Sequence, residues 1–206
     1  MNETQHLPRL IVASNNQNKI REFRAILGTR FEIVSMKEAG MDTDIEETGT
    51  TFEENALIKA RAVAESACEG DIVLADDSGL EIDYLGGEPG IYSARYMGED
   101  TSYRIKNANL ISRLDGVPKE ERTARFVCAI AAVIPGEERQ ELVVRGTIEG
   151  YIGWEEKGSN GFGYDPIFYV DEYGCSTAEL DSETKNRISH RGNALRMMKE
   201  RLDGIL

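Results

Sequence analysis

In the first half of the chain, short continuous apolar runs alternate with segments in which apolar residues recur at helical spacing. Short apolar runs at residues 10–13, 31–36 and 72–75 indicate buried strands. In the segments 19–27 and 50–67, apolar residues recur every three or four positions, which predicts helices with one apolar face. Thr51 and Glu54 have the spacing of a capping box, which places the start of the second helix at Thr51.

The second half is richer in strand patterns. Residues 124–152 predict two long strands joined by a turn at 135–138. A helix is predicted at 102–116, closed by Gly116, and a C-terminal one has Leu195, Met198 and Leu202 on one face. A glycine-rich loop at 155–166 leads into a further strand. The predicted strands alternate with helices in the first half, and antiparallel strands follow in the second half. This order predicts an α/β fold around a mixed sheet.

Composition narrows the function classes. The 206 residues, 40% of them hydrophobic, suit one large α/β domain or two close lobes. With a net charge of −13, the chain is a poor general ligand for nucleic-acid backbones. No run approaches the roughly 18 apolar residues of a membrane span, and the N-terminus lacks a signal-peptide pattern. We therefore expect a cytoplasmic protein that binds neither nucleic acid nor membranes.

Cysteine and histidine content limits the possible metal sites. Cys68, Cys128 and Cys175 are widely spaced, with no C-x-x-C motif, so neither a zinc site nor a disulfide framework is indicated. His6 and His190 are the two histidines of the chain. Any metal should therefore be a hard cation held by carboxylates, such as Mg²⁺.

Two adjacent carboxylates, Asp76 and Asp77, follow the apolar run at 72–75. A buried carboxylate must be hydrogen-bonded, paired or bound to a metal. Because side chains alternate along a strand, the two should point in different directions. The stretch is equally compatible with an Asx-type turn that ends the strand and with a carboxylate that faces a functional cleft.

The segment "SNNQNK", residues 14–19, lies between the first strand and the first helix. Free N–H groups at a helix start favour a phosphate, and Lys19 adds a cation, although an ordinary N-cap by Asn or Ser explains the same residues. Further along, Glu46 and Glu47 form either a solvated acidic loop or part of a divalent-cation site with the aspartates. Lys59 is either a surface lysine or a phosphate ligand.

Two later motifs complete the candidate chemistry. In "GSNGFGYDPIF", Phe162 or Tyr164 could stack on a base, while Asp165 could be a plain turn residue. "ETKNRISHRGNAL" gathers basic side chains in an acidic chain, although a polar connection between two helices is the simpler explanation. Together, the motifs describe a hydrolytic site for a nucleoside triphosphate.

The order of these motifs resembles the Ham1-like family of inosine/xanthosine triphosphate pyrophosphatases. The resemblance rests on "SNNQNKIREF", "EETGTTFEENALIKAR", "ADDSGLEIDYLGGEPGIYSARY", "GFGYDPIF" and "KNRISHRGNAL", and spans Leu10 to Met198. It implies hydrolysis of ITP, dITP and XTP to the monophosphate and pyrophosphate, which removes non-standard purines from the nucleotide pool. It also implies a single two-lobed domain over 1–206 with a long central mixed β-sheet flanked by helices, an active-site cleft between the lobes, Mg²⁺ dependence and a homodimer.

The resemblance also implies roles for particular residues. Asp77 is the expected general base and, with Glu46, a metal ligand. The expected substrate-binding residues are Ser14, Asn15, Asn16, Gln17, Asn18, Lys19, Lys59, Ser78, Phe162, Gly163, Tyr164, Asp165, Lys185, His190 and Arg191. Where the family usually carries a glycine near position 15 or 18, this chain has asparagine, which tolerates the left-handed conformation better than most residues.

Three expectations stay open at this point. A Maf-type nucleotide pyrophosphatase is a related alternative, and a nucleotide-binding regulator without hydrolytic activity is an alternative from another class. The "SNNQNK" turn and the "SHR" segment argue against the first, and Lys19, Glu46 and Asp77 argue against the second. The aromatic loop at 85–98 could present Tyr92, Tyr96 and Met97 to a second copy of the chain.

Overall fold

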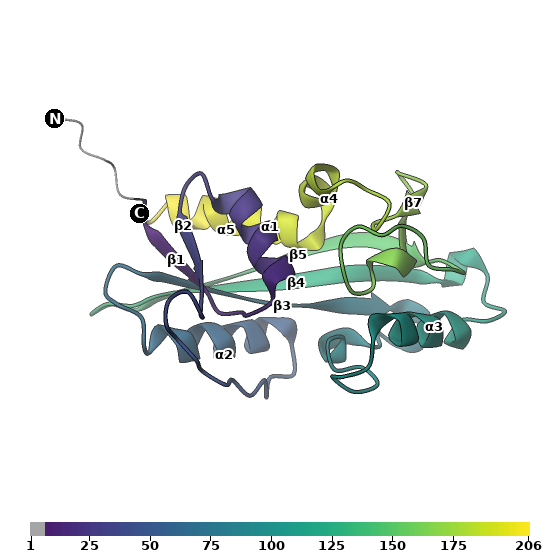
Figure 1. Ribbon diagram of the computed structural model, residues 1–206, viewed down its shortest axis with the longest axis horizontal. Helices are drawn as coiled ribbons and strands as arrows, with labels where there is room; N and C mark the ends of the chain where they lie inside the picture. Colours follow the sequence, from purple (N-terminus) through teal and green to yellow (C-terminus); the bar gives the residue numbers. More distant parts are fainter. Residues whose placement is uncertain (1–6) are drawn as a thin grey trace. The chain divides into compact units, whose positions relative to one another are not determined.

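The computed structural model describes residues 7–206 (Figure 1). In chain order, its strands and α-helices are β1 (Arg9–Val12), α1 (Gln17–Leu27), β2 (Glu32–Ser35), α2 (Phe52–Ala64), β3 (Ile72–Ile82), α3 (Tyr103–Arg113), β4 (Thr123–Ile134), β5 (Gln140–Ile152), β6 (Phe168–Val170), β7 (Cys175–Ser176), α4 (Ser182–Ile188) and α5 (His190–Asp203). No helix in this part of the chain combines the length and the apolar composition that crossing a membrane requires.

The strands form one sheet in the order β2-β1-β3-β4-β5-β6-β7. β1 runs parallel to both β2 and β3, so Leu10 lies beside Ile33 and Ile72. β6 runs antiparallel to β5 and to β7. The sheet is therefore mixed, and with its flanking helices it confirms the predicted α/β class. The predicted hairpin is present as β4 and β5, which are neighbours in the sheet.

The chain divides into two compact units. The first contains the chain up to Asp77 together with Ala129–Arg145 and Ala194–Leu206, and the second contains Ser78–Cys128 and Gly146–Asn193. β3, β4 and β5 contribute residues to both units. The single domain over 1–206 and the cleft between lobes stay predictions.

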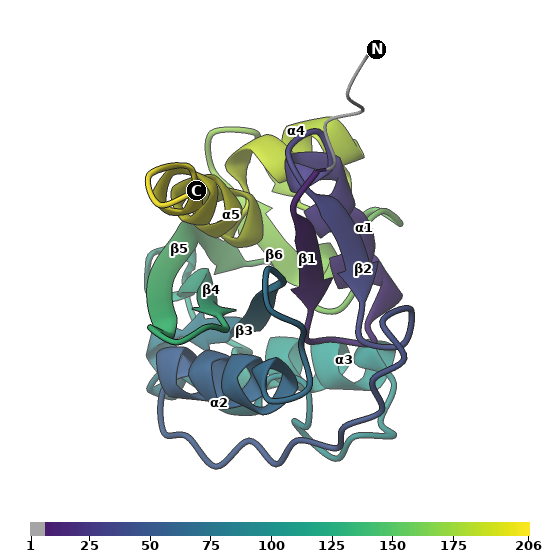
Figure 2. The ribbon, with the colours of Figure 1, turned by 90° about the vertical axis from the view of Figure 1, so that its left-hand side faces the viewer.

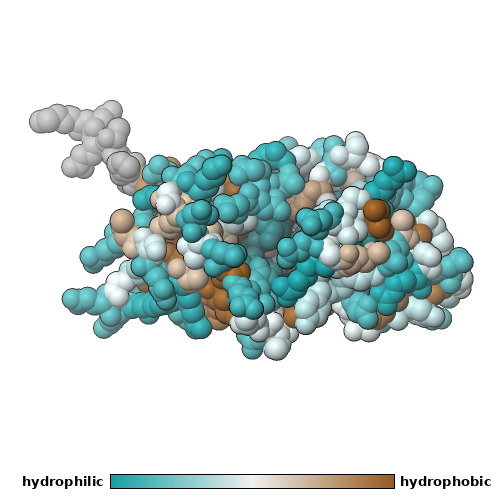
Figure 3. Space-filling model, turned by 60° about the horizontal axis from the view of Figure 1, so that its bottom comes forward, coloured by the Kyte–Doolittle hydropathy of each residue, from teal (hydrophilic) through white to brown (hydrophobic). Residues whose placement is uncertain are grey.

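In the first unit, helices cover both faces of the strands. α2 lies on one side of β1 and β3, and α1 and α5 lie on the other (Figures 1 and 2). The apolar positions of the predicted helices are buried: Ile20, Phe23 and Leu27 on α1; Phe52, Ala56, Ala60 and Val63 on α2; and Leu195, Met198 and Leu202 on α5. Ala67, which the sequence pattern also assigns to the stripe of the second helix, lies beyond the end of α2 and is half-buried. Thr51 caps α2 as expected, because its hydroxyl accepts the N–H of Glu54 at 3.1 Å. Hydrophilic side chains cover much of the face shown in Figure 3, with hydrophobic ones scattered among them.

In the second unit, α3 packs on the sheet through Leu110, which joins a core with Leu80, Phe126 and Phe168. Arg122 is 1% exposed beside this core. Its guanidinium donates to the carbonyls of Leu114, Ile152 and Gly153 at 2.6–2.7 Å. A buried guanidinium is tolerated there because its N–H groups meet these carbonyl acceptors.

The strand at 72–75 is longer than the sequence pattern predicts. β3 continues through Asp76 and Asp77 to Ile82, so the interpretation of these residues as a strand-ending turn is wrong. Charged residues usually end an apolar run, but here both carboxylates have lysine partners that allow them to be buried within the strand. The C-terminal helix, which the sequence pattern places from Gly192 onward, begins two residues earlier, because α5 starts at His190.

Candidate active site

Asp76 and Asp77 point to opposite faces of β3, as adjacent strand residues must. Asp76 is paired with Lys19 of α1, with 2.7 Å between Nζ and Oδ1. Asp77 is paired with Lys59 of α2, with 3.1 Å between Nζ and Oδ1. Because α1 and α2 cover opposite sides of the strand, each carboxylate meets a cation from a different helix (Figure 1).

Four side chains surround the second of these pairs, and we call Glu47, Asn55, Lys59 and Asp77 the Asp77 cluster. The Lys59 ammonium contacts both carboxylates, at 3.1 Å from Asp77 and 2.9 Å from Glu47. Asn55 Nδ2 donates to Asp77 Oδ2 at 3.3 Å, while Asn55 Oδ1 accepts the backbone N–H of Gly49 at 2.8 Å. Asn55 therefore links the aspartate to the loop that carries Glu46 and Glu47.

Sequence reasoning named Glu47, Lys59 and Asp77 but missed Asn55. This asparagine is fully buried within an amphipathic helix, whose apolar face carries Ala56 beside it. A polar residue at a buried helical position was the available signal, because such a residue needs hydrogen-bond partners.

Burial raises the pKa of Asp77, and the nearby Glu47 charge acts in the same direction, while Lys59 opposes both. For Lys59, burial alone would lower the pKa, but the charges of Asp77, Asp76 and Glu47 outweigh it and raise the pKa overall. Lys59 is thus held as an ammonium. A carboxylate with a raised pKa is a better proton acceptor than an ordinary aspartate.

The turn before α1 is organised by Asn16. Its side-chain oxygen accepts the N–H groups of Asn18 and Lys19 at 3.0 and 3.3 Å, so the expected asparagine N-cap is present. The Ser14 hydroxyl accepts the N–H of Asn16, and Gln17 Nε2 donates to the Asn15 carbonyl. Neither Asn15 nor Asn18 is left-handed, because within residues 7–206 Met97 is the non-glycine residue with positive φ. The turn therefore does not need the glycine conformation.

The donor set around Asp77 fits a hard divalent cation. Glu47 lies within the Asp77 cluster, whereas Glu46, the expected metal ligand, is exposed. Within the described part of the chain, no three Asp, Glu, His or Cys side chains are grouped to hold a metal. The site thus offers a pair of carboxylates at most, which is the number that Mg²⁺ takes from a protein when water and phosphate complete its shell.

In the second unit, Asp165 organises the aromatic motif. Its carboxylate accepts the Phe162 N–H at 2.8 Å, the Thr177 hydroxyl at 2.8 Å and the Lys185 ammonium at 2.6 Å. The Phe162 ring is half-buried, with the Lys185 ammonium 5.1 Å and the Arg191 guanidinium carbon 5.7 Å from its centroid. We call Phe162, Asp165, Lys185 and Arg191 the Phe162 cluster.

Arg191 and His190 begin α5 and are both buried. Arg191 donates to the Ser78 hydroxyl at 2.9 Å. His190 stacks on Phe126, with 4.8 Å between ring centroids and 20° between planes. Among the predicted site residues, the structure brings Ser78, Phe162, Lys185 and Arg191 together.

The two aromatic residues of the motif differ in accessibility. Tyr164 is 4% exposed within the core of the second unit, and its hydroxyl donates to the Ser93 carbonyl at 2.6 Å. Its ring is therefore not available for stacking. The half-buried Phe162 ring is the one that could receive a base.

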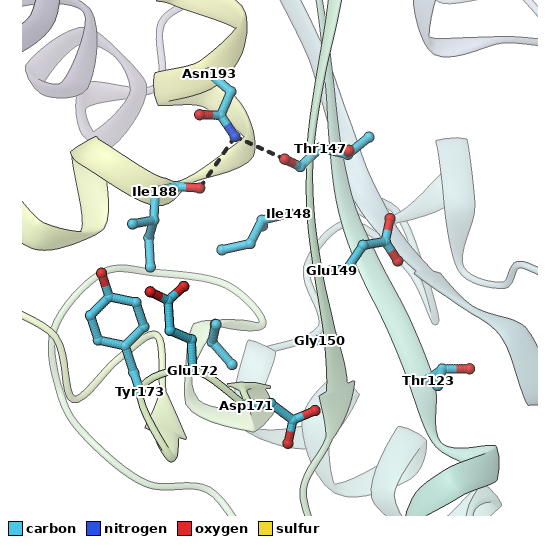
Figure 4. A pocket seen from close by; sticks show the side chains of 11 residues that line it. Thr123, Thr147, Ile148, Glu149, Gly150, Asp171, Glu172, Tyr173, Ile188 and Asn193 are labelled. Carbon is cyan, nitrogen blue, oxygen red and sulfur yellow. Dashed lines mark hydrogen bonds between the residues drawn. The ribbon is translucent and has the colours of Figure 1, made fainter.

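A cavity of about 500 Å³ also lies in the second unit (Figure 4). Three carboxylates line it, Glu149, Asp171 and Glu172, and no Lys or Arg does. None of the predicted site residues lines it either. An acidic cavity repels phosphate, so this cavity is a poor candidate for the nucleotide site.

Comparison with known proteins places these clusters in a family. The model of the Ham1 family matches residues 10–201. A dITP/XTP pyrophosphatase of Caldanaerobacter subterraneus is 52% identical over 93% of this chain and 94% of its own length. One of Bacillus licheniformis is 49% identical over 96% of this chain and 99% of its own. The solved structure of the Staphylococcus aureus Ham1 protein superposes with a TM-score of 0.83 at 43% identity, covering 96% of this chain and all of the other.

The residues matched by the family model include both the Asp77 cluster and the Phe162 cluster. Chains that are about 50% identical over almost their full lengths share one fold, and the TM-score with the solved Ham1 structure shows the same fold directly. The motifs, the mixed sheet and these likenesses all lead to one assignment, and the chain belongs to the Ham1 family.

Proposed function

We propose that this chain hydrolyses non-standard purine nucleoside triphosphates, namely ITP, dITP and XTP, to the monophosphate and pyrophosphate. The observation that carries the proposal is the Asp77 cluster, a buried carboxylate of raised pKa next to a second carboxylate and a lysine. Relatives of about 50% identity bear the name dITP/XTP pyrophosphatase, which supports the substrate class.

The phosphates bind at the turn from Ser14 to Lys19, with the N-terminus of α1 and Lys19 as the positive groups. Asp77 and a glutamate of the 46–47 pair would hold Mg²⁺, which would neutralise phosphate charge. Lys59 and Lys185 are the further cations among the proposed phosphate and nucleotide ligands.

Asp77 acts as the general base. It takes a proton from a water molecule whose oxygen forms a bond to the α-phosphorus, and the bond from that phosphorus to the bridging oxygen breaks. Pyrophosphate leaves with the electron pair, and the nucleoside monophosphate keeps the water oxygen. Lys59 and Asn55 hold the Asp77 carboxylate on its face of β3 during this step.

The Phe162 cluster supplies base recognition. The Phe162 ring stacks on the purine, and Lys185, His190 and Arg191 provide donors. Hypoxanthine and xanthine carry an acceptor carbonyl at C6, where adenine carries an amino donor. A donor facing that amine leaves a buried group unsatisfied, so such a site rejects ATP.

The test is product analysis with ITP, XTP, GTP, ATP and dTTP, with Mg²⁺ and with excess chelator, on the wild type and Asp77→Asn. We expect IMP and pyrophosphate from ITP, much slower use of ATP, and loss of turnover in the variant and in chelator. Preferred hydrolysis of dTTP would support the Maf-type alternative, and nucleotide binding without products would support a regulator. Equal use of ATP and ITP would refute the proposal.

We also propose a homodimer. Tyr92 and Met97 are 57% and 47% exposed, as an interface of the aromatic loop requires. Tyr96 is half-buried and hydrogen-bonded to Asn109 and Arg113, so it serves the loop rather than a partner. Light scattering at micromolar concentration should give twice the 22.9 kDa chain mass, and a monomer would refute this. The cytoplasmic location stays a prediction.

A further inference from the structure

A buried asparagine on α3 contacts the turn that carries Phe162. Asn107 is 1% exposed, and its Nδ2 donates to the Gly163 carbonyl at 3.3 Å and to Glu156 Oε1 at 2.7 Å. Gly163 follows Phe162 directly and has a φ of +69°. Neither the sequence motifs nor the proposed chemistry assigns a role to Asn107.

We propose that Asn107 is a positioning residue for base recognition, which holds the Gly163–Tyr164 peptide directly after Phe162 so that the Phe162 ring keeps its place beside Lys185 and Arg191. The inference rests on the proposed function of the Phe162 cluster. It concerns how that cluster discriminates between purines, not the hydrolytic step.

The turn has little stiffness of its own. Phe162 lies between Gly161 and Gly163, whose φ values are +73° and +69°, and glycine populates many other conformations with equal ease. Contacts from outside the turn must therefore select the observed conformation. The Asp165 carboxylate holds the N–H side of Phe162, and Asn107 is the side chain that holds the carbonyl of Gly163.

α3 supports the same turn at a second point. Tyr103, one helical turn before Asn107, packs edge-on against Tyr164 with 5.1 Å between centroids and 87° between planes. A Cβ atom at Gly163 would lie 3.5 Å from the Tyr103 ring. α3 thus contacts both residues that follow Phe162, and Asn107 provides the polar contact.

Stability alone does not explain an asparagine here. Asn107 Oδ1 is buried and has no hydrogen-bond partner among residues 7–206. An unsatisfied buried acceptor is destabilising, whereas leucine has the same branched arrangement of side-chain heavy atoms and no polar atom to satisfy. A residue that is unfavourable for packing but contacts the base-binding turn is consistent with a functional role.

The experiment compares Asn107→Leu with Asn109→Leu, a matched control on the same helix. The side chain of Asn109 serves another contact, because its Oδ1 accepts a hydrogen bond from the Tyr96 hydroxyl at 2.7 Å. For Asn107→Leu we expect KM for ITP to rise about tenfold with kcat nearly unchanged, and the preference for ITP over ATP to fall by a similar factor. The control should keep the wild-type KM and preference.

A spectroscopic readout comes from Trp154, the one tryptophan of the chain, two residues before Glu156. Loss of the Asn107 contacts should make the emission of Trp154 more easily quenched by acrylamide, and the control should not. Glu156→Ala removes this acceptor of Asn107 and should leave purine preference unchanged, which separates the Gly163 contact from the Glu156 contact. If Asn107→Leu does not fold, Asn107→Ser also removes the donor and should show the same KM and preference changes.

Unchanged KM and purine preference in a folded Asn107 variant would overturn the inference, as would equal effects in the Asn109 control. These outcomes are distinct from failure of the proposed function. In that case the wild type itself would not form IMP and pyrophosphate from ITP.

Discussion

The buried ion pair between Lys185 and Asp165 gives the sharpest structural prediction. Their side chains are 7% and 4% exposed, and 2.6 Å separates the ammonium from Asp165 Oδ2. Lys185→Met keeps most of the aliphatic chain and removes the charge. The Asp165 carboxylate then stays buried without its cation, which is the arrangement that proteins tolerate least.

The magnitude follows from what remains around Asp165. Removing one partner of a buried pair destabilises a protein by about 3–5 kcal/mol. Asp165 keeps two donors, the Phe162 N–H and the Thr177 hydroxyl, so the lower end applies. With about 2–4 °C per kcal/mol for a chain of this size, a loss of about 3 kcal/mol lowers Tm by about 6–12 °C.

Thermal and urea unfolding at pH 7 provide the assay, with Lys119→Met as the control. Lys119 and Asp171 are also 2.6 Å apart, but their side chains are 46% and 71% exposed, so solvent screens them and no resolvable change in Tm is expected. The double variant Asp165→Asn/Lys185→Met should be more stable than Lys185→Met, because the amide leaves no buried charge. If Lys185→Met lowers Tm no more than Lys119→Met does, the reasoning is wrong.

Three further predictions use other parts of the chain. Hydrogen bonds from the Ser35 N–H and, to a smaller extent, from Arg24 lower the pKa of Glu38 from its ordinary value of 4.5 to about 2. The ionised Glu38 therefore stabilises the fold fully above pH 4.5, and this stabilisation is lost as the pH falls through about 2. Glu38→Gln should therefore lower Tm at pH 7, and its Tm should converge with the wild type as the pH approaches 2 in thermal scans. Asn55→Leu should reduce kcat/KM for ITP by about tenfold or more with unchanged circular dichroism, because Asp77 loses a charge-assisted donor. Arg122→Met should lower the free energy of unfolding by about 3 kcal/mol in urea, because it leaves three buried carbonyls without their donor.

The sequence predicts those features of the fold that depend on local pattern. The spacing of apolar residues predicts the buried stripes of α1, α2 and α5 and the β4–β5 hairpin. Each of these features depends on residues that are close in sequence, within a few helical turns or across one chain reversal. The part of β3 after Ala75 could not be predicted from the local pattern. Its continuation depends on Lys19 and Lys59, which lie on helices remote in sequence, and no local pattern shows that these lysines will meet Asp76 and Asp77.

The candidate site shows the same limit at the level of single residues. Sequence motifs gather Glu46 with Glu47 and Phe162 with Tyr164, but spacing does not tell which member of each pair reaches the cluster. The structure distinguishes them: Glu47 pairs with Lys59, whereas Glu46 is exposed, and the Tyr164 ring is buried while Phe162 is half-buried. Glu46 and Glu47 differ because neighbouring side chains in an extended segment point in opposite directions. Phe162 and Tyr164 are separated by Gly163, whose φ of +69° turns the backbone between them.

The lysines of the candidate site have a further property that no motif expresses. Each is already paired with a carboxylate: Lys19 with Asp76, Lys59 with Asp77 and Glu47, and Lys185 with Asp165. A chain with a net charge of −13 can hold such cations buried only by matching them in this way. In the proposed reaction, a triphosphate would therefore meet lysines whose charge is partly compensated, so Lys19, Lys59 and Lys185 would supply less net positive charge than their number suggests. The N-terminus of α1 and a divalent cation would then supply the rest, which is the physical reason for expecting a metal-dependent reaction in this chain.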